Sequence, residues 1–268
     1  MFIAGASWEI SSGSKMCIRD RFECHLIMIY KNNFLSGYFF ISLVSLVMLL
    51  NACKKDVYLE VSSNNYNSYY PVEIGYWIEY QADSIIHLSN DDINLVDTSI
   101  VAYHFYIREE IDSAMIDGEG DTAYVISRYK RTADTLPWEF TAIWTSKLTK
   151  NSLERVEDNR RYIRMTFPFK PDYIWNGNAY NNLTQEDYTY EDLFSSSTFS
   201  GLNFDSTVTI NQNEFISNIN RIIKKEIYGN HVGLLYKQID SVGVANTQNG
   251  IVILSGLEYE QTVTDYKQ

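Results

Sequence analysis

The sequence predicts an all-β domain of mainly antiparallel strands, in the form of a curved half-barrel or barrel-like sheet with one or two short helices. Three observations predict it. Apolar and polar residues alternate with period two along much of residues 71–268, turn-forming segments separate the alternating stretches, and 21 of the 268 residues are tyrosine. Alternation with period two places one face of a strand in a core and the other in water, which is typical of antiparallel sheets.

The first half of this region contains the clearest strands. The sequence Asp-Gly-Glu-Gly-Asp at 117–121 predicts a hairpin turn between two of them. It does not predict a calcium site, because the EF-hand spacing and the distal glutamate are absent. Residues 151–158 are expected to form a connection with one helical turn. The expected strands are 76–82, 99–108, 121–131, 138–148 and 160–167.

The second half alternates less regularly. Residues 171–205 are rich in Asn, Ser, Tyr and acidic residues, so we expect a long surface excursion with a short helix near 185–194. Residues 213–225 leave helix and strand open, because their isoleucines and Phe215 also fit the spacing i, i+3, i+4, i+7 of an amphipathic helix. The further expected strands are 206–210, 222–228, 233–240 and 251–266.

An uncharged run of 17 residues, 34–50, precedes the domain and ends just before a cysteine. A basic start, an apolar middle and a small residue before a cleavage point are typical of an export signal. Leu50 and Ala52, directly before Cys53, resemble the lipobox that the lipoprotein signal peptidase recognises, although Asn51 departs from the usual pattern. The resemblance implies cleavage before Cys53 and a lipid on its sulfur. It also implies anchoring to the outer membrane, facing the periplasm or the cell surface.

These boundaries divide the chain into four parts. Residues 1–27 are expected to be a non-native or artefactual leader, because SGSKMCIRDR at 12–21 resembles translated sequencing-adapter read-through. Residues 28–52 are the expected lipoprotein signal peptide, 53–70 a flexible tether rich in Ser and Asn, and 71–268 a single β domain. Cys17 and Cys24 lie in the leader, so no disulfide is expected within the mature chain.

The charge balance excludes one class of partner. The chain has a net charge of −12, and the residues before Cys53 contain four basic and three acidic side chains, so the remainder is slightly more acidic. An acidic surface is repelled by phosphate backbones, so nucleic acid is not an expected partner. Membrane attachment is expected to depend on the lipid at Cys53 rather than on a basic surface.

Motifs for catalysis, metals or cofactors are missing from the sequence. His87, His104 and His231 lack the spacing and cysteine partners of a zinc site, and no G-x-S-x-G nucleophile motif occurs. Neighbouring carboxylates such as Glu109 and Glu110 point to opposite sides of a strand and are expected to be solvated. We therefore expect a monomeric, non-enzymatic protein without catalytic residues, metal or cofactor. A hydrolase assembled from distant residues is a remote alternative.

Aromatic and amide side chains are the remaining functional signal. Trp175, Asn176, Asn178 and Tyr180 lie together in the expected excursion. Aromatic faces beside amides stack on sugars or cover an apolar ligand, so these four are candidate ligand contacts. The alternative is that Trp175 caps an open end of the sheet. The expected function is to bind or carry an apolar or glycan ligand, and the alternative is a structural or assembly role in which the protein docks a protein partner.

Several segments resemble an uncharacterised family of Bacteroidetes lipoproteins across most of residues 70–267. The resemblance is carried by YYPVEIGYWIEY (69–80), NRRYIRMTFP (159–168), IWNGNAYN (174–181), KEIYGNHVGLLYKQID (225–240) and LEYEQTVTDYK (257–267). It implies a β-rich envelope lipoprotein and does not imply any particular activity. At the level of the fold, the last two segments also resemble a hairpin of periplasmic lipid-carrier half-barrels of the LolA type.

Overall fold

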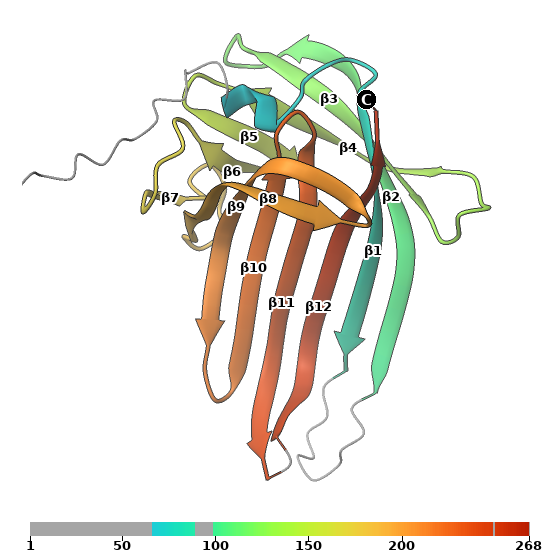
Figure 1. The fold of residues 1–268 in the computed structure, drawn as a ribbon, viewed down its shortest axis with the longest axis vertical. Coiled ribbons are helices and arrows are strands. Elements are labelled where there is room, and N and C mark those ends of the chain that lie inside the picture. The colour runs from blue at the N-terminus through green and yellow to red at the C-terminus, as the bar shows by residue number, and fades with distance from the viewer. Residues whose placement is uncertain (1–65, 89–98, 249, 268) are drawn as a thin grey trace, which may run out of the picture. The chain divides into compact units, whose positions relative to one another are not determined.

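The computed structural model describes residues 66–88, 99–248 and 250–267 (Figure 1), all of which lie in one compact unit, 59–268. Within these ranges the chain forms twelve antiparallel strands and one short 3-10 turn, so the predicted all-β class is confirmed. The elements are η1 (Tyr66–Tyr69), β1 (Trp77–His87), β2 (Ile100–Ile116), β3 (Thr122–Arg131), β4 (Glu139–Leu148), β5 (Ser152–Glu157), β6 (Arg160–Thr166), β7 (Ile174–Asn176), β8 (Asp187–Phe199), β9 (Leu202–Ile216), β10 (Asn220–Gly229), β11 (Gly233–Thr247) and β12 (Gly250–Tyr266).

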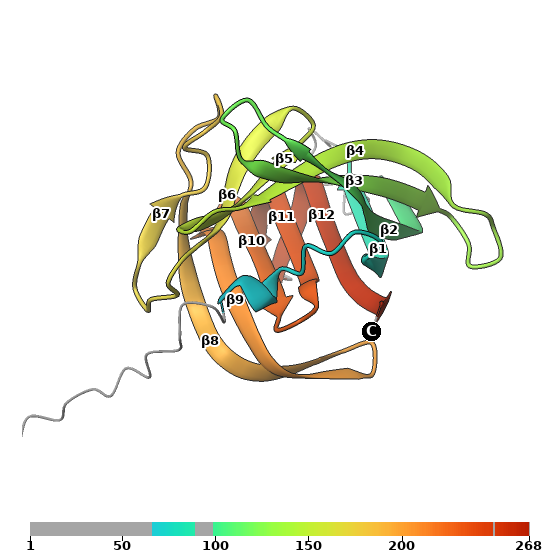
Figure 2. The ribbon, with the colours of Figure 1, turned by 90° about the horizontal axis from the view of Figure 1, so that it is seen from above.

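The strands form one sheet that curls into a nearly closed barrel. Its order is β6-β5-β4-β3-β2-β1-β12-β11-β10-β9-β8-β7, so β1 and β12 pair, while β6 and β7 are the two ends. These ends meet at a seam, where the Ile163 N–H donates to the Gly177 carbonyl (3.0 Å) and the Trp175 indole N–H to the Ile163 carbonyl (3.1 Å). Figure 2 looks along the barrel and shows the strands arranged around its interior.

The wall is closed at one end and open at the other. β2 pairs with β3 only from Tyr106 onward, and β8 pairs with β9 only up to Asn211. Past these points the wall continues as a six-stranded sheet, which Figure 1 shows below the other strands. It consists of β9, β10, β11, β12, β1 and β2. We call the part with all twelve strands the closed part and this extension the open sheet. The sequence did not distinguish a closed barrel from a half-barrel. The structure combines a barrel-like region, the closed part, with a curved sheet, the open sheet.

Tyrosines and phenylalanines fix the segment that enters the barrel. Tyr66 and Tyr69 are buried and pack on Phe169, with ring centroids 4.8 and 5.2 Å apart. The His231 N–H, in the turn between β10 and β11, donates to the Ser68 carbonyl (2.7 Å). Residues 66–70 thus belong to the packed unit, although the sequence placed them in the tether, because their aromatic rings supply apolar area that holds them on the core.

Two local predictions were wrong. Residues 151–158 contain β5 rather than a helical turn, and 171–205 contains β7, β8 and the start of β9 rather than an excursion with a helix. β8 contains three register shifts, between 190 and 197, and these break the period-two alternation that reveals a strand. Residues 213–225, for which the sequence allowed either helix or strand, form the end of β9, a turn and the start of β10. Phe215 lies opposite Ile222 across the hairpin, so the helix-like spacing comes from two strands with a turn between them.

The described residues contain no helix that is both long and apolar enough to cross a membrane. Several predictions concern residues that the structure does not describe. These are the leader 1–27, the signal peptide 28–52 with Leu50 and Ala52, lipidation of Cys53, and the tether as far as residue 65.

Candidate functional site

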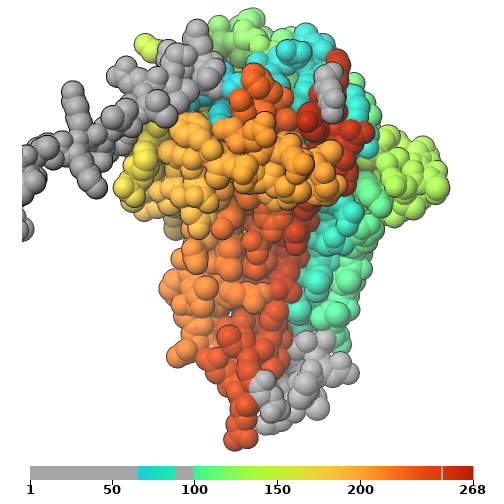
Figure 3. All heavy atoms as spheres, viewed as in Figure 1, coloured from blue at the N-terminus to red at the C-terminus, as the bar shows by residue number. Residues whose placement is uncertain are grey.

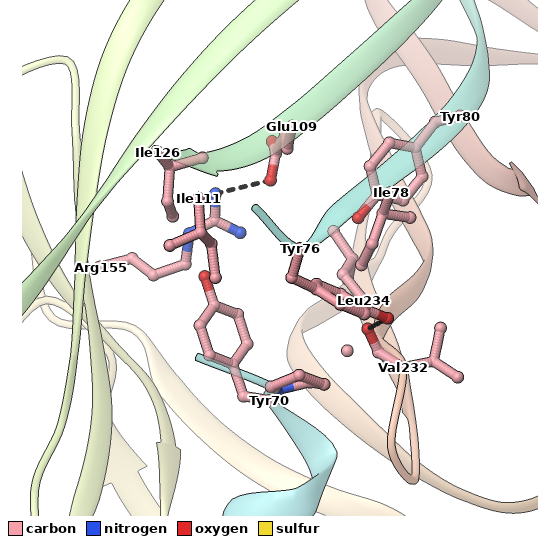
Figure 4. Close-up of a pocket in the computed structure, with 12 residues that line it drawn as sticks. Tyr70, Tyr76, Ile78, Tyr80, Glu109, Ile111, Ile126, Arg155, Val232 and Leu234 are labelled. Atoms are coloured by element: carbon pink, nitrogen blue, oxygen red, sulfur yellow. Dashed lines mark hydrogen bonds and ion pairs between the residues drawn. The ribbon is translucent and has the colours of Figure 1, made fainter. Parts of the chain in front are cut away.

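The interior of the closed part contains paired charges. Arg155 of β5 and Glu109 of β2 meet inside the barrel, and the guanidinium Nη2 donates to Glu109 Oε2 at 3.0 Å (Figure 4). Arg155 Nε also lies 3.3 Å from Glu157 Oε1. The side chains of Arg155 and Glu109 are only 3% and 10% exposed, so this pair is withdrawn from water. The sequence prediction that Glu109 is solvated was wrong, whereas Glu110 does lie on the other face, where it pairs with Arg108.

A second group of paired charges lies on the inner side of β6, β10 and β11. Arg164 Nη2 donates to Glu157 Oε2 (2.8 Å), and Lys237 Nζ lies 3.0 Å from Glu226 Oε1. Burial alone would raise the pKa of Glu226, but the nearby charges of Arg164 and Lys237 lower it below its ordinary value. The pKa of Glu157 is lowered in the same way. Both carboxylates are therefore ionised at neutral pH and are poorly suited to act as general acids.

Little space remains beside these charges. A cavity of about 30 Å³ lies among Tyr70, Tyr76, Tyr80, Arg155 and Leu234 (Figure 4). That is room for on the order of one or two water molecules. This cavity is therefore too small for an organic ligand.

The open sheet has an apolar inner face. Ile86 of β1 lies opposite both Val101 and Leu257, and Ile222 lies opposite Phe215. Directly opposed residues share one side of a sheet, so these side chains continue the inner surface of the barrel wall. We call the set the inner apolar face, and it consists of Ile86, Val101, Tyr103, Phe215, Ile222, Ile239, Leu257 and Tyr259.

This face is only partly covered. Among the described residues, Tyr103 and Phe215 are 51% and 53% exposed, and Ile86 and Val101 are each 37% exposed. The outer side of the same strands is polar: His104 pairs with Asp83 (2.8 Å) and His87 with Glu258 (2.7 Å). The usual arrangement would place the polar side toward water and the apolar side under a cover. Here the apolar side is left accessible, which makes it a candidate binding surface.

Cations lie where the inner apolar face meets the closed part. The Lys130 Nζ is 3.7 Å from the centre of the Phe105 ring, and no described carboxylate pairs with it. Lys224 lies opposite Ile239 and pairs with Glu186. The inner surface therefore changes from apolar to basic along the strands, an arrangement that suits a ligand with an apolar chain and a negatively charged or polar end.

The four candidate ligand contacts from the sequence lie at the seam instead. Trp175 is buried and bonds to Ile163, as described above. Asn176 Oδ1 accepts from the Asn178 N–H (2.9 Å), and Asn178 Nδ2 donates to the Thr184 carbonyl (2.7 Å). Tyr180 is exposed, with the guanidinium of Arg161 4.6 Å from its ring centre. Three of the four side chains thus hold the loop that closes the barrel, and their contact with a ligand stays a prediction.

The acidic turn between β2 and β3 holds a lysine. Carboxylate oxygens of Asp117, Glu119 and Asp121 lie within 4.8 Å of one another, as in a metal site. However, Lys147 Nζ lies 2.8, 2.5 and 3.2 Å from these three groups. The ammonium provides the charge that a cation would bring, and its hydrogen bond lowers the pKa of Asp117 to about 2. The prediction of a hairpin turn is confirmed.

Sequence reasoning placed the inner apolar face on strands without recognising it as a site. Leu257 and Tyr259 alternate with the polar residues Glu258 and Glu260, and Val101 and Tyr103 lie on the apolar face of a predicted strand. Such a pattern looks the same whether the apolar side is covered or not. The missing information is where the neighbouring strands end, and that depends on pairing between distant segments.

Comparison with known proteins adds little to this geometry. No family model matches the chain, and no curated protein matches it. Two solved structures are similar over 74% of this chain and 98% of their own. One is a candidate lipoprotein from Parabacteroides distasonis ATCC 8503, with 8% identity and a TM-score of 0.39. The other is a candidate exported protein with a YmcC-like fold from Bacteroides fragilis NCTC 9343, with 10% identity and a TM-score of 0.34.

Proposed function

We propose that this protein is a lipid-anchored envelope protein that binds the apolar chain of an amphiphilic ligand on the inner apolar face and does not convert it chemically. One observation carries the proposal: the uncovered side of the open sheet is apolar, whereas the interior of the closed part is filled by packed apolar side chains and paired charges. A soluble domain rarely leaves the apolar side of a sheet accessible unless something binds there.

An acyl chain matches this surface in chemistry. Burying one methylene group contributes about 0.8 kcal/mol, so roughly ten methylenes contribute about 8 kcal/mol before the entropic cost of association is subtracted. Lys130, which no described carboxylate pairs with, favours a carboxylate or phosphate at the end of the chain. A glycan is less well suited to this face. Seven of its eight members are either aliphatic or aromatic without a neighbouring amide. The eighth, Tyr259, already donates its hydroxyl to Gln261.

Binding is tested with purified protein and the fluorescent apolar probe N-phenyl-1-naphthylamine. We expect the probe to bind and a long-chain fatty acid to displace it, and we expect Val101→Asp and Leu257→Asp to weaken probe binding about tenfold or more. Ile116→Asp is the control, because Ile116 is also aliphatic and exposed but lies at the far end of β2. Equal loss in the control variant, or no probe binding to the parent protein, would refute the proposal.

The anchor is tested separately. The lipobox-like residues 50–53 support lipid attachment at Cys53 and hence a place in the cell envelope. Cells that express the protein with labelled palmitate should yield a labelled band, and Cys53→Ser should abolish the label. Label that persists in Cys53→Ser would show that the lipid is attached elsewhere or that another segment holds the membrane.

A further inference from the structure

Two hairpin tips of the described residues lie at the free end of the open sheet. β10 pairs with β11 only as far as Gly243, and β1 pairs with β12 only as far as Gly256. Beyond these points the β11–β12 hairpin projects as a two-stranded ribbon, visible at the lower end of Figures 1 and 3. The turn from β9 to β10 lies beside its base, where the Val244 N–H donates to the Ile219 carbonyl (2.8 Å). We call these tips, residues 215–220, 244–248 and 250–255, the uncharged rim.

The rim exposes large aliphatic side chains without any charge beside them. Ile216, Ile219 and Ile251 are 62%, 68% and 67% exposed. No Asp, Glu, Lys, Arg or His occurs at 215–220 or 241–257, although 21% of the chain is charged. Isolated exposed apolar residues are normal on proteins, but hairpin tips that combine several of them with no charged residue are not.

The opposite end of the barrel shows the contrast. Ile116 is 67% exposed at the β2–β3 hairpin, as much as Ile251. There, however, Asp117, Glu119 and Asp121 follow directly in the turn. An exposed isoleucine beside three carboxylates cannot enter hydrocarbon without a large desolvation cost, whereas the uncharged rim can.

We propose that the uncharged rim inserts into the interfacial region of a lipid bilayer. Narrow tips with aliphatic ends and no ionised group suit the headgroup and acyl boundary, where apolar area drives binding. The net charge of −12 gives no attraction to anionic headgroups, so the contact depends on insertion and favours a zwitterionic surface. This contact goes beyond ligand binding on the inner apolar face and does not depend on it.

The test uses the full chain with an excess of phosphatidylcholine vesicles that contain a lipid with a diazirine in its acyl chain. After irradiation, labelled residues are located by mass spectrometry. We expect label on 215–220 and 250–253 of the rim. Ile216→Asp, Ile219→Asp and Ile251→Asp should each reduce it about tenfold at the substituted tip, because an ionised aspartate is unfavourable at the boundary of the hydrocarbon region. Ile116→Asp is the matched control and should leave the rim label unchanged.

Each other outcome has a clear meaning. Label at the Ile116 hairpin as strong as at the rim would overturn the proposal. So would an unlabelled rim that crosslinks to a second copy of the chain or to another protein. Label on Val101 and Tyr103 without label on the rim would support ligand binding on the inner apolar face and overturn insertion. Circular dichroism confirms that each variant is folded, and Ile219→Ser provides a milder substitution that should also lower the label.

Discussion

The closed part and the open sheet share six strands but differ in what lies on their inner sides. On β2, Glu109 faces inward in the closed part and Val101 faces inward in the open sheet. On β10 the corresponding residues are Glu226 and Ile222. The closed part encloses charged pairs within a core of buried apolar side chains, whereas the open sheet leaves apolar side chains partly exposed. A protein selected only for stability and solubility would avoid both features, because enclosed charge costs desolvation and uncovered apolar area promotes association.

This difference indicates separate roles for the two regions. Buried ion pairs contribute little net stability, but losing one partner is costly, so they tolerate only one arrangement of the strands around them. The closed part therefore serves as a rigid, filled support. The open sheet has few such constraints and presents a surface to which another molecule can bind.

The largest expected effect comes from removing one charge in the closed part. Arg164→Leu leaves Glu157 and Glu226 without the guanidinium between them and should lower the free energy of unfolding by about 3–5 kcal/mol. Urea unfolding measures it. Lys225→Leu is the control, since Lys225 pairs with the half-exposed Glu191 and should change stability by at most about 1 kcal/mol. Equal effects of both substitutions would remove the distinction between enclosed and exposed pairs.

Alkaline pH provides the next test of the closed part. Burial raises the pKa of Tyr70, Tyr80 and Tyr228 above the ordinary value of 10. Their contribution to stability is complete below pH 10 and is lost as pH rises, because the unfolded chain ionises first. The loss should approach about 1.4 kcal/mol per pH unit for each tyrosine. Urea unfolding between pH 8 and 11.5 measures this, and Tyr80→Phe should reduce the slope. An unchanged slope in Tyr80→Phe would contradict it.

The seam should be weaker than the rest of the closed wall. Trp175→Phe keeps an aromatic ring but leaves the Ile163 carbonyl without its indole donor, so we expect a loss of about 1–2 kcal/mol in unfolding free energy. Tyr173→Phe, at an exposed neighbouring position, is the control and should have almost no effect. Hydrogen exchange of the Ile163 amide would show whether β6 and β7 separate locally in Trp175→Phe.

The smallest expected effect concerns the open sheet. Val101→Asp should change the free energy of unfolding by no more than about 0.5 kcal/mol, because the side chain is already partly in water. The same substitution is expected to weaken binding of the apolar probe. A loss of several kcal/mol in the free energy of unfolding would mean that Val101 belongs to the buried core. The open sheet would then not present an accessible apolar face.

Much of the fold follows from local pattern, but the division into two regions does not. The strands around Tyr80, Ile126 and Ile163 were predictable because each alternates cleanly. β8 was not, since its bulges shift the alternation. Glu109 is on the same strand face as Ile107 and Ile111, which is the one sequence signal that it is enclosed. Its partner Arg155 is 46 residues away, and no local pattern connects them.

The candidate site could be predicted even less well. Trp175 and Asn178 attracted attention because their residue types suit ligand binding, yet both are used to hold the seam. Val101 and Leu257 look like ordinary core residues in sequence. Their accessibility arises because β3 and β8 stop short, and the end of a strand is determined by cross-strand pairing rather than by the strand's own residues.

The entry point of the chain restricts how an anchored molecule can stand on its membrane. Tyr66 enters beside the β10–β11 turn, at the end of the barrel opposite the uncharged rim. Thirteen residue steps separate Cys53 from Tyr66, a reach of at most about 45 Å when fully extended, while the 17 residues of β12 span about 55 Å. With lipid on Cys53, an upright molecule would direct its rim away from the anchoring membrane and toward whatever surface faces it. To touch its own membrane, the barrel would have to lie on its side.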